Sequence, residues 1–214
     1  MNAPLSFPAR TTAARSPWPL VNIVVVSGLS PVDVDPWQSW LESRFPQATW
    51  VRPLDGDWPD LDRWAARIDA CLESAEASPG GLVLAHGFGA LAVVRHAALG
   101  RQRPACGILV TPAQPSRFAQ DAASLGSPLP YPCTLVAPLG GAHEESPWLQ
   151  DDQAVEWAAR WGCRLADAGR GPVRHAHAVA GATPPWPEAE AVVSAGMAPL
   201  LARARRLPLA DAVS

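Results

Sequence analysis

The segment at residues 85–89 reads Ala-His-Gly-Phe-Gly and follows an apolar run at positions 82–84. A strand, a sharp turn and a helix, with small residues around the turn, form the setting of a nucleophile elbow, G-x-S-x-G. The serine of such an elbow attacks a carbonyl carbon during acyl transfer. Gly87 occupies the position of that serine and has no side chain with which to attack. The segment therefore predicts the turn without its nucleophile.

Other side chains could contribute chemistry, although the sequence spacing gives none of them a partner. His177 is the remaining candidate for a general base that activates water, and the alternative is a ring that only hydrogen bonds near the surface. Ser27 and Thr111 each follow an expected strand, but no histidine is placed beside either one. His143 and His175 lack H-E-x-x-H or a comparable ligand spacing, so we expect no metal and no cofactor.

Length and charge limit the classes of function. The chain has 214 residues, a formal net charge of -3, and 17 basic residues that are all arginine. This composition gives no basic surface for nucleic acid, and no apolar run approaches the ~20 residues that cross a membrane. Residues 1–19 lack the apolar core of a secretion signal, so we expect a disordered leader there. We expect one domain at 20–206 and a frayed tail at 207–214.

The four cysteines are widely spaced and form no C-x-x-C pair: Cys71, Cys106, Cys133 and Cys163. This spacing argues against a zinc site. It is typical of reduced thiols in a cytoplasmic protein, where each cysteine serves as a small core residue.

Apolar runs alternate with amphipathic segments along the chain. Strands are expected at residues 21–26, 49–52, 82–85, 107–110, 133–137 and 163–166. Helices are expected at residues 37–45, 60–77, 88–99, 151–161 and 188–205, and residues 112–132 are expected to be irregular. This alternation predicts an α/β fold with a mostly parallel sheet of about five to six strands and helices on both faces.

Six segments in this order resemble one family of small hydrolases. They are Val-Val-Val-Ser-Gly-Leu at 24–29, Trp-Gln-Ser-Trp at 37–40, Trp-Pro-Asp-Leu-Asp-Arg-Trp at 58–64, Ala-His-Gly-Phe-Gly at 85–89, Ser-Pro-Trp at 146–148, and Ala-His at 176–177 followed by Pro-Trp-Pro-Glu at 185–188. From about residue 22 to residue 201 the chain resembles the retinoblastoma-binding-protein-9 and YdeN family of serine hydrolases. The resemblance implies an α/β-hydrolase-like three-layer sandwich.

The family resemblance implies hydrolysis of esters or amides by a Ser-Asp-His triad. Carried over by position, the serine falls on Gly87, the aspartate on Ser146 and the histidine on His177. The chain carries extra residues at 138–145, where Glu144 or Glu145 could orient the histidine in place of the aspartate. Two of the three triad side chains are therefore expected to be lost.

The backbone of the site could outlast its side chains. By the superfamily's geometry, the oxyanion hole would be formed by the N–H groups of Phe88 and Leu29. It would hold a carboxylate or carbonyl group, or else bind only water. Trp148 and Trp186 fall on loops expected to rim the site. His86 is expected to be packed and structural.

Three hypotheses follow, from different classes. The first is a pseudo-hydrolase that binds a small carboxylate, an ester-like molecule or a protein. The second is an active ester or amide hydrolase with a site rewired around His177, or a hydrolase whose Gly87 was introduced in the laboratory, which would leave Ser146 unexplained. The third is a structural scaffold without a ligand. All three hypotheses leave open whether the protein forms a homo-oligomer.

Overall fold

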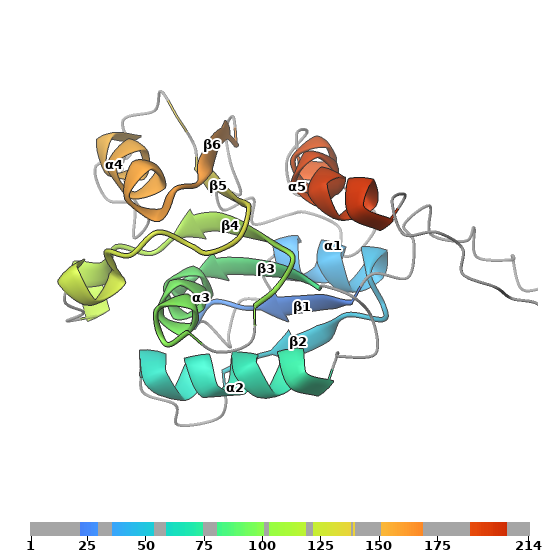
Figure 1. Cartoon of the computed structure of the whole chain (residues 1–214). Helices are drawn as coiled ribbons and strands as arrows, with labels where there is room; N and C mark the ends of the chain where they lie inside the picture. Colours follow the sequence, from blue (N-terminus) through green and yellow to red (C-terminus); the bar gives the residue numbers. More distant parts are fainter. Residues whose placement is uncertain are drawn as a thin grey trace, which may run out of the picture.

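The computed structural model describes residues 22–29, 36–53, 59–74, 81–100, 103–118, 122–137, 139, 151–168 and 189–204. The predicted leader at 1–19 and the predicted tail at 207–214 lie outside these residues. Within them, the chain forms a sheet with helices on both faces (Figure 1). None of the helices placed by the structure is long and apolar enough to cross a membrane.

All six strands of the sheet run parallel, in the order β2-β1-β3-β4-β5-β6. The strands are β1 Ile23–Val26, β2 Thr49–Val51, β3 Leu82–Gly87, β4 Cys106–Pro112, β5 Cys133–Ala137 and β6 Arg164–Asp167. This arrangement confirms the predicted α/β three-layer fold. Each strand lies within two residues of its predicted bounds, and β3 and β4 run further toward the carboxyl edge than expected.

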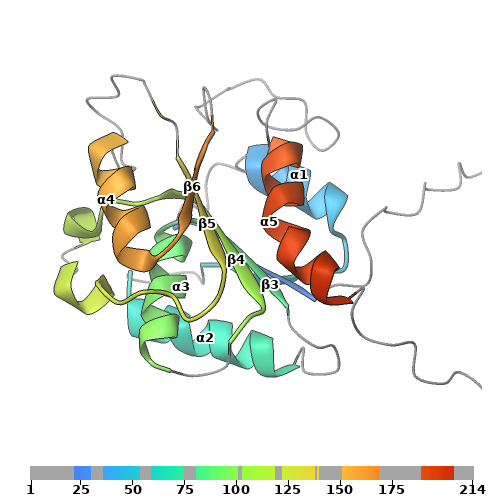
Figure 2. The same cartoon turned by 45° about the horizontal axis from the view of Figure 1, so that its top comes forward.

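The helices divide into two layers. They are α1 Pro36–Arg44, α2 Leu61–Ser74, α3 Phe88–Ala98, α4 Asp151–Trp161 and α5 Ala189–Ala204. Helices α2, α3 and α4 cover one face of the sheet, and α1 and α5 cover the other (Figure 2). The predicted irregular segment contains two short 3-10 helices, at Pro115–Phe118 and Ala122–Leu125.

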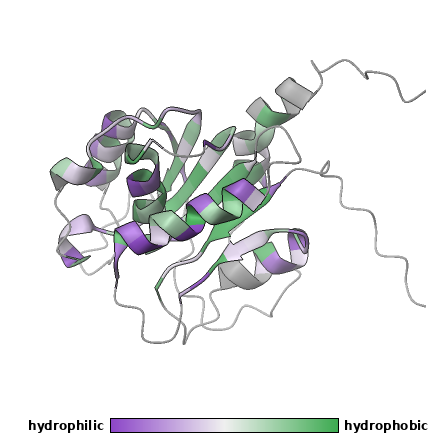
Figure 3. Cartoon of the chain, turned by 60° about the horizontal axis from the view of Figure 1, so that its bottom comes forward, coloured by the Kyte–Doolittle hydropathy of each residue, from purple (hydrophilic) through white to green (hydrophobic). Residues whose placement is uncertain are grey.

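The buried strands contribute alternate side chains to two separate hydrophobic cores. In β1, Val24 and Val26 belong to the core under α2, α3 and α4, whereas Ile23 and Val25 belong to the core under α1 and α5. Successive side chains of a strand point to opposite faces, so a run of apolar residues supplies both cores. Figure 3 accordingly shows a mainly hydrophobic sheet, whereas the helices mix both kinds of residue.

Helix α2 shows why the amphipathic segments form where they do. The Asp60 carboxylate accepts hydrogen bonds from the backbone N–H groups of Asp62, at 2.9 Å, and Arg63, at 3.1 Å, which caps the first turn. The helix buries one apolar stripe, formed by Leu61, Trp64, Ile68 and Leu72.

Candidate functional site: an elbow without a nucleophile

Gly87 is the last residue of β3 and immediately precedes α3. Its backbone has φ 56° and ψ -122°, a conformation that costs a residue with a side chain strain energy and that glycine adopts freely. The parallel pairing with β4 shifts register here, so that Gly87 stands opposite Pro112 and its carbonyl accepts a hydrogen bond from the Ala113 N–H at 3.1 Å. The predicted strand-turn-helix is confirmed, with the backbone of a strained elbow.

Gly89 explains how the elbow lies against the neighbouring strand. A Cβ atom at this position would lie 2.4 Å from the Ser27 carbonyl oxygen and 2.7 Å from that of Val26. Real Cβ atoms essentially never approach backbone this closely, so only glycine lets the first turn of α3 approach the end of β1. This contact brings the segment from Ser27 to Leu29 beside the start of α3.

The side chain of Phe88, the first residue of α3, is buried in the core. The ring is 2% exposed and packs edge-on against Trp64, with centroids 5.5 Å apart, and against Phe118, at 4.9 Å. Only its backbone is left to serve a site. The N-terminus of α3 has no side-chain cap, and unpaired N–H groups at a helix start favour negative charge. Leu29 packs against the same core.

The other predicted site residues lie outside the described residues: Ser146, His177, Trp148 and Trp186, together with His143, Glu144, Glu145 and His175. The topology nevertheless fixes where their segments begin. Strands β5 and β6 end at Ala137 and Asp167, and the carboxyl ends of parallel strands share one edge of the sheet. The chain therefore leaves the sheet toward Ser146 and toward His177 at the edge that carries Gly87.

The two alternative nucleophiles are both buried. Ser27 is 2% exposed, and its hydroxyl donates a hydrogen bond to the Val51 carbonyl at 3.2 Å, which ties it to β2. Thr111 is 1% exposed and has a φ of 38°, an outlier for a β-branched residue. Its hydroxyl has no hydrogen-bond partner in the described part of the chain. Neither hydroxyl is positioned to attack a substrate in this conformation.

The histidines that the structure describes take structural positions. His86 is buried, in keeping with the packed role expected of it, and its ring lies beside Gly28. His96 is a buried partner of Asp69, with 3.1 Å between Nε2 and Oδ1. Sequence reasoning missed this pair, because no spacing rule links α2 to α3. His96 is near the end of α3 farther from Gly87, so the pair joins two helices rather than serving the elbow.

A metal site finds no support in the part of the chain that the structure describes. No group of three or more histidine, cysteine, aspartate or glutamate side chains there could hold an ion. Among the described residues, the elbow offers the hydrogen-bonding capacity of its backbone, together with the helix end behind it.

A comparison with protein families decides the wider class. Residues 23–195 match the family described as serine hydrolase. The chain belongs to the serine hydrolase family. No match was found among curated proteins.

Solved structures agree with membership of the serine hydrolase family. A YdeN-like hydrolase from Pectobacterium atrosepticum is similar at 31% identity and a TM-score of 0.60, over 73% of this chain and 86% of that one. The ydeN gene product of B. subtilis is 15% identical, with a TM-score of 0.52 over 70% and 87% of the two chains. A hydrolase of the alpha/beta superfamily from Xanthomonas campestris is 14% identical, with a TM-score of 0.53 over 86% and 99%. The last two show the fold alone.

Proposed function

We propose that this serine hydrolase-family protein is a pseudo-hydrolase that binds a small molecule bearing a carboxylate or ester-like group at the elbow. One observation carries the proposal. Gly87 keeps the left-handed backbone that presents a nucleophile, at φ 56° and ψ -122°, but supplies no nucleophile. In serine proteases, loss of the nucleophile costs on the order of 10⁶ in rate. Binding needs none of the missing side chains.

The ligand class follows from the groups that the elbow offers. The N–H of Phe88 lies at the uncapped start of an 11-residue helix, and the close packing of Gly89 brings the segment ending at Leu29 beside it. N–H donors at a helix N-terminus favour an anionic oxygen over a neutral one. A carboxylate matches this environment better than an amine or an alkane.

The test pairs two glycines that both have a positive φ. Gly100 also has a left-handed φ, of 69°, and nothing lies within 4 Å of where its Cβ would be. Gly87→Ala and Gly100→Ala should each lower the free energy of unfolding by about 1 kcal/mol, because both force a side chain into that conformation. Only Gly87→Ala would place a methyl group in the proposed binding site.

We expect short-chain carboxylates, screened by thermal shift, to raise the Tm of the native protein and of the Gly100→Ala variant. Gly87→Ala itself should lose the shift, and amides of the same shape should give a smaller one. A ligand present at 100 times its Kd stabilises by about 2.7 kcal/mol, which is measurable in a domain of this size. Equal shifts in both variants would place the ligand elsewhere.

A fluorophosphonate probe separates this function from the two alternatives. The pseudo-hydrolase should not be labelled, and p-nitrophenyl esters should be hydrolysed no faster than by a His177→Ala control. Stoichiometric labelling, mapped to Ser27, Thr111 or any other hydroxyl, would identify a working hydrolase. If the probe does not label the protein and no carboxylate raises its Tm, a scaffold without a ligand would be favoured.

A further inference from the structure

Two cysteines lie at the amino-terminal ends of neighbouring strands, at the edge of the sheet opposite the elbow. Thr134 of β5 pairs with Arg164 of β6 in parallel register, so the preceding residues, Cys133 and Cys163, stand opposite each other. Neighbouring strands lie about 4.8 Å apart, which falls within the Cα separation of about 4.4–6.8 Å that a disulfide spans. The Cys163 thiol is near enough to Cys133 to raise the pKa of the Cys133 thiol.

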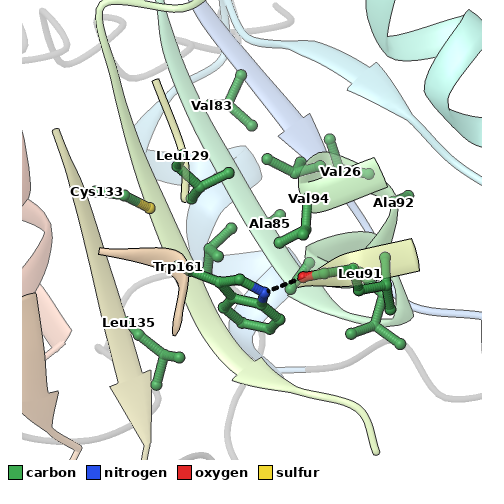
Figure 4. Close-up of a cluster of buried hydrophobic side chains, with 14 of the residues drawn as sticks. Val26, Val83, Ala85, Leu91, Ala92, Val94, Leu129, Cys133, Leu135 and Trp161 are labelled. Atoms are coloured by element: carbon green, nitrogen blue, oxygen red, sulfur yellow. Dashed lines mark hydrogen bonds between the residues drawn. The ribbon is translucent and has the colours of Figure 1, made fainter. Parts of the chain in front are cut away.

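Both thiols of this pair face the same core. Cys133 belongs to the cluster under α2, α3 and α4, which also contains Leu129 and Trp161 (Figure 4), and Cys163 packs against that cluster. Cys106 begins β4 but belongs to the core on the other face, and it is Gly107 that pairs with Cys133. Among the described cysteines, only Cys163 therefore lies both opposite Cys133 in the strand register and on the same face of the sheet.

Gly107 of β4 makes room for the Cys133 sulfur. A Cβ atom on Gly107 would lie 3.1 Å from this sulfur, so the missing side chain of Gly107 is what keeps the space beside it open. Cys163 is half-buried, whereas Cys133 is buried, so a small oxidant reaches Cys163 first.

We propose that Cys133 and Cys163 form a reversible disulfide in response to hydrogen peroxide. The Cys163 sulfur attacks one peroxide oxygen, the O–O bond breaks, and sulfenic acid and one water result. The Cys133 sulfur then attacks the sulfenic sulfur, and the S–O bond breaks. The disulfide forms and a second water leaves. Two thiols lose two electrons in total, and one peroxide is reduced to two waters.

The environment of Cys133 makes it the second of the two thiols to react, not the first. Its hydrogen bond with Cys163 and its burial raise the pKa of the Cys133 thiol well above the usual range. Peroxide reacts with thiolates, so the buried and protonated Cys133 is not the first thiol to react. It gives up its proton only as it attacks the sulfenic sulfur of Cys163, and the departing oxygen leaves with that proton as water. The resulting bond ties the start of the edge strand β6 to β5 and closes the loop of residues 133–163, which contains α4.

The experiment treats the folded, reduced protein with stoichiometric hydrogen peroxide and reads intact mass and a non-reducing peptide map. We expect a monomer lighter by two hydrogen atoms, a Cys133–Cys163 cross-linked peptide, and full reversal by dithiothreitol. Cys163→Ser should abolish the cross-link. Cys71→Ser is the matched control, because Cys71 is half-buried on α2, and it should leave the cross-link unchanged.

Cys163→Ser is the decisive variant because its position is already partly exposed, whereas Cys133→Ser places a hydroxyl in the core and risks misfolding. Circular dichroism before and after oxidation shows that the reaction occurred in the folded protein. A cross-link that joins Cys106 or Cys71 instead, a disulfide between two chains, or oxidation of Cys163 to sulfinic acid without a cross-link would overturn the proposal.

Discussion

Gly87 and Thr111 are neighbours on adjacent strands, and both have a positive φ, of 56° and 38°. At Gly87 the conformation costs nothing, whereas at Thr111 a β-branched side chain holds it against its preference. Strain of this kind concentrates at functional sites because the surrounding structure must maintain it. At the scale of single residues, a positive φ therefore occurs on both strands at the shift in register beside the candidate site.

Restoring the missing side chains tests how much of that site has survived. Gly87→Ser returns a nucleophile and Ser146→Asp an orienting carboxylate. Triad members act as a unit, so we expect weak esterase activity at most from Gly87→Ser and more from the double variant than the product of the single effects. The serine should also cost about 1–3 kcal/mol of stability through its positive φ.

The measurements are fluorophosphonate labelling and ester hydrolysis for both single variants and the double. Gly100→Ser controls for backbone strain without touching the elbow. A double variant that folds but stays inert would mean that the pocket has been remodelled beyond the triad, and it would shift the balance toward a scaffold.

Gly89 makes a second prediction for a single residue. In Gly89→Ala the new methyl group would meet the Ser27 carbonyl oxygen at 2.4 Å, and backbone cannot move aside as a flexible side chain can. We expect a loss of about 1–3 kcal/mol in the free energy of unfolding, measured by urea denaturation. Gly28→Ala, whose nearest atom lies at 3.5 Å, should cost far less. Equal losses in the two variants would contradict the close approach of α3 to β1.

At the scale of the elements, hydrophobic periodicity carried the prediction. The run of β-branched residues in β1 and the stripe of Trp64 and Ile68 on α2 each favour one element on local grounds. These local signals were enough to predict the order of strands and helices, and hence the parallel sheet. The turn at Gly87 was predictable for the same reason, because small residues between a strand and a helix permit a tight turn.

Features that depend on contacts between distant segments could not be predicted in this way. The clash that reserves position 89 for glycine involves β1, and the pair of His96 and Asp69 joins two helices. The φ of Thr111 follows from the register shift against Gly87. Whether Ser146 and His177 meet at the elbow stays a prediction, because both lie outside the described residues.

Trp161 shows how one side chain can hold an irregular segment to the sheet layers. Its indole N–H donates to the Leu125 carbonyl at 2.7 Å, and its ring is completely buried (Figure 4). Trp161→Phe removes that donor and leaves a cavity, so we expect a loss of about 2–3 kcal/mol in thermal or urea unfolding. Trp157→Phe, one turn earlier on α4, keeps the bond to Leu125 and should lose less. A larger loss of stability in Trp157→Phe than in Trp161→Phe would argue against this anchoring role.

At the scale of the whole molecule, the parallel sheet has two chemically different edges. The carboxyl edge carries the elbow, and the amino edge carries Cys106, Cys133 and Tyr131. Burial raises the pKa of the Cys106 thiol to about 12 from a usual 9.0, and it also raises the pKa of Tyr131. These groups resist ionisation in the folded state, whereas the unfolded chain exposes them to water.

Stability should therefore fall at alkaline pH. The folded pKa is raised, so the contribution is complete below about pH 9, the pKa of the exposed thiol, and is lost as the pH rises toward about 12. Each such group adds a slope of up to about 1.4 kcal/mol per pH unit. Urea denaturation across this range measures the slope. Cys106→Ala should flatten it, despite a lower stability at neutral pH, and an unchanged slope would exclude Cys106 as a source.

The backbone at Gly87 also has an evolutionary consequence. A serine there is held under about 1–3 kcal/mol of strain, in a protein whose whole margin of stability is typically about 5–15 kcal/mol. A lineage that no longer needs the reaction becomes more stable when it exchanges that serine for glycine, and it must give up the same stability to return. Catalysis at such an elbow is easier to lose than to regain, and selection for stability alone is enough to keep the glycine.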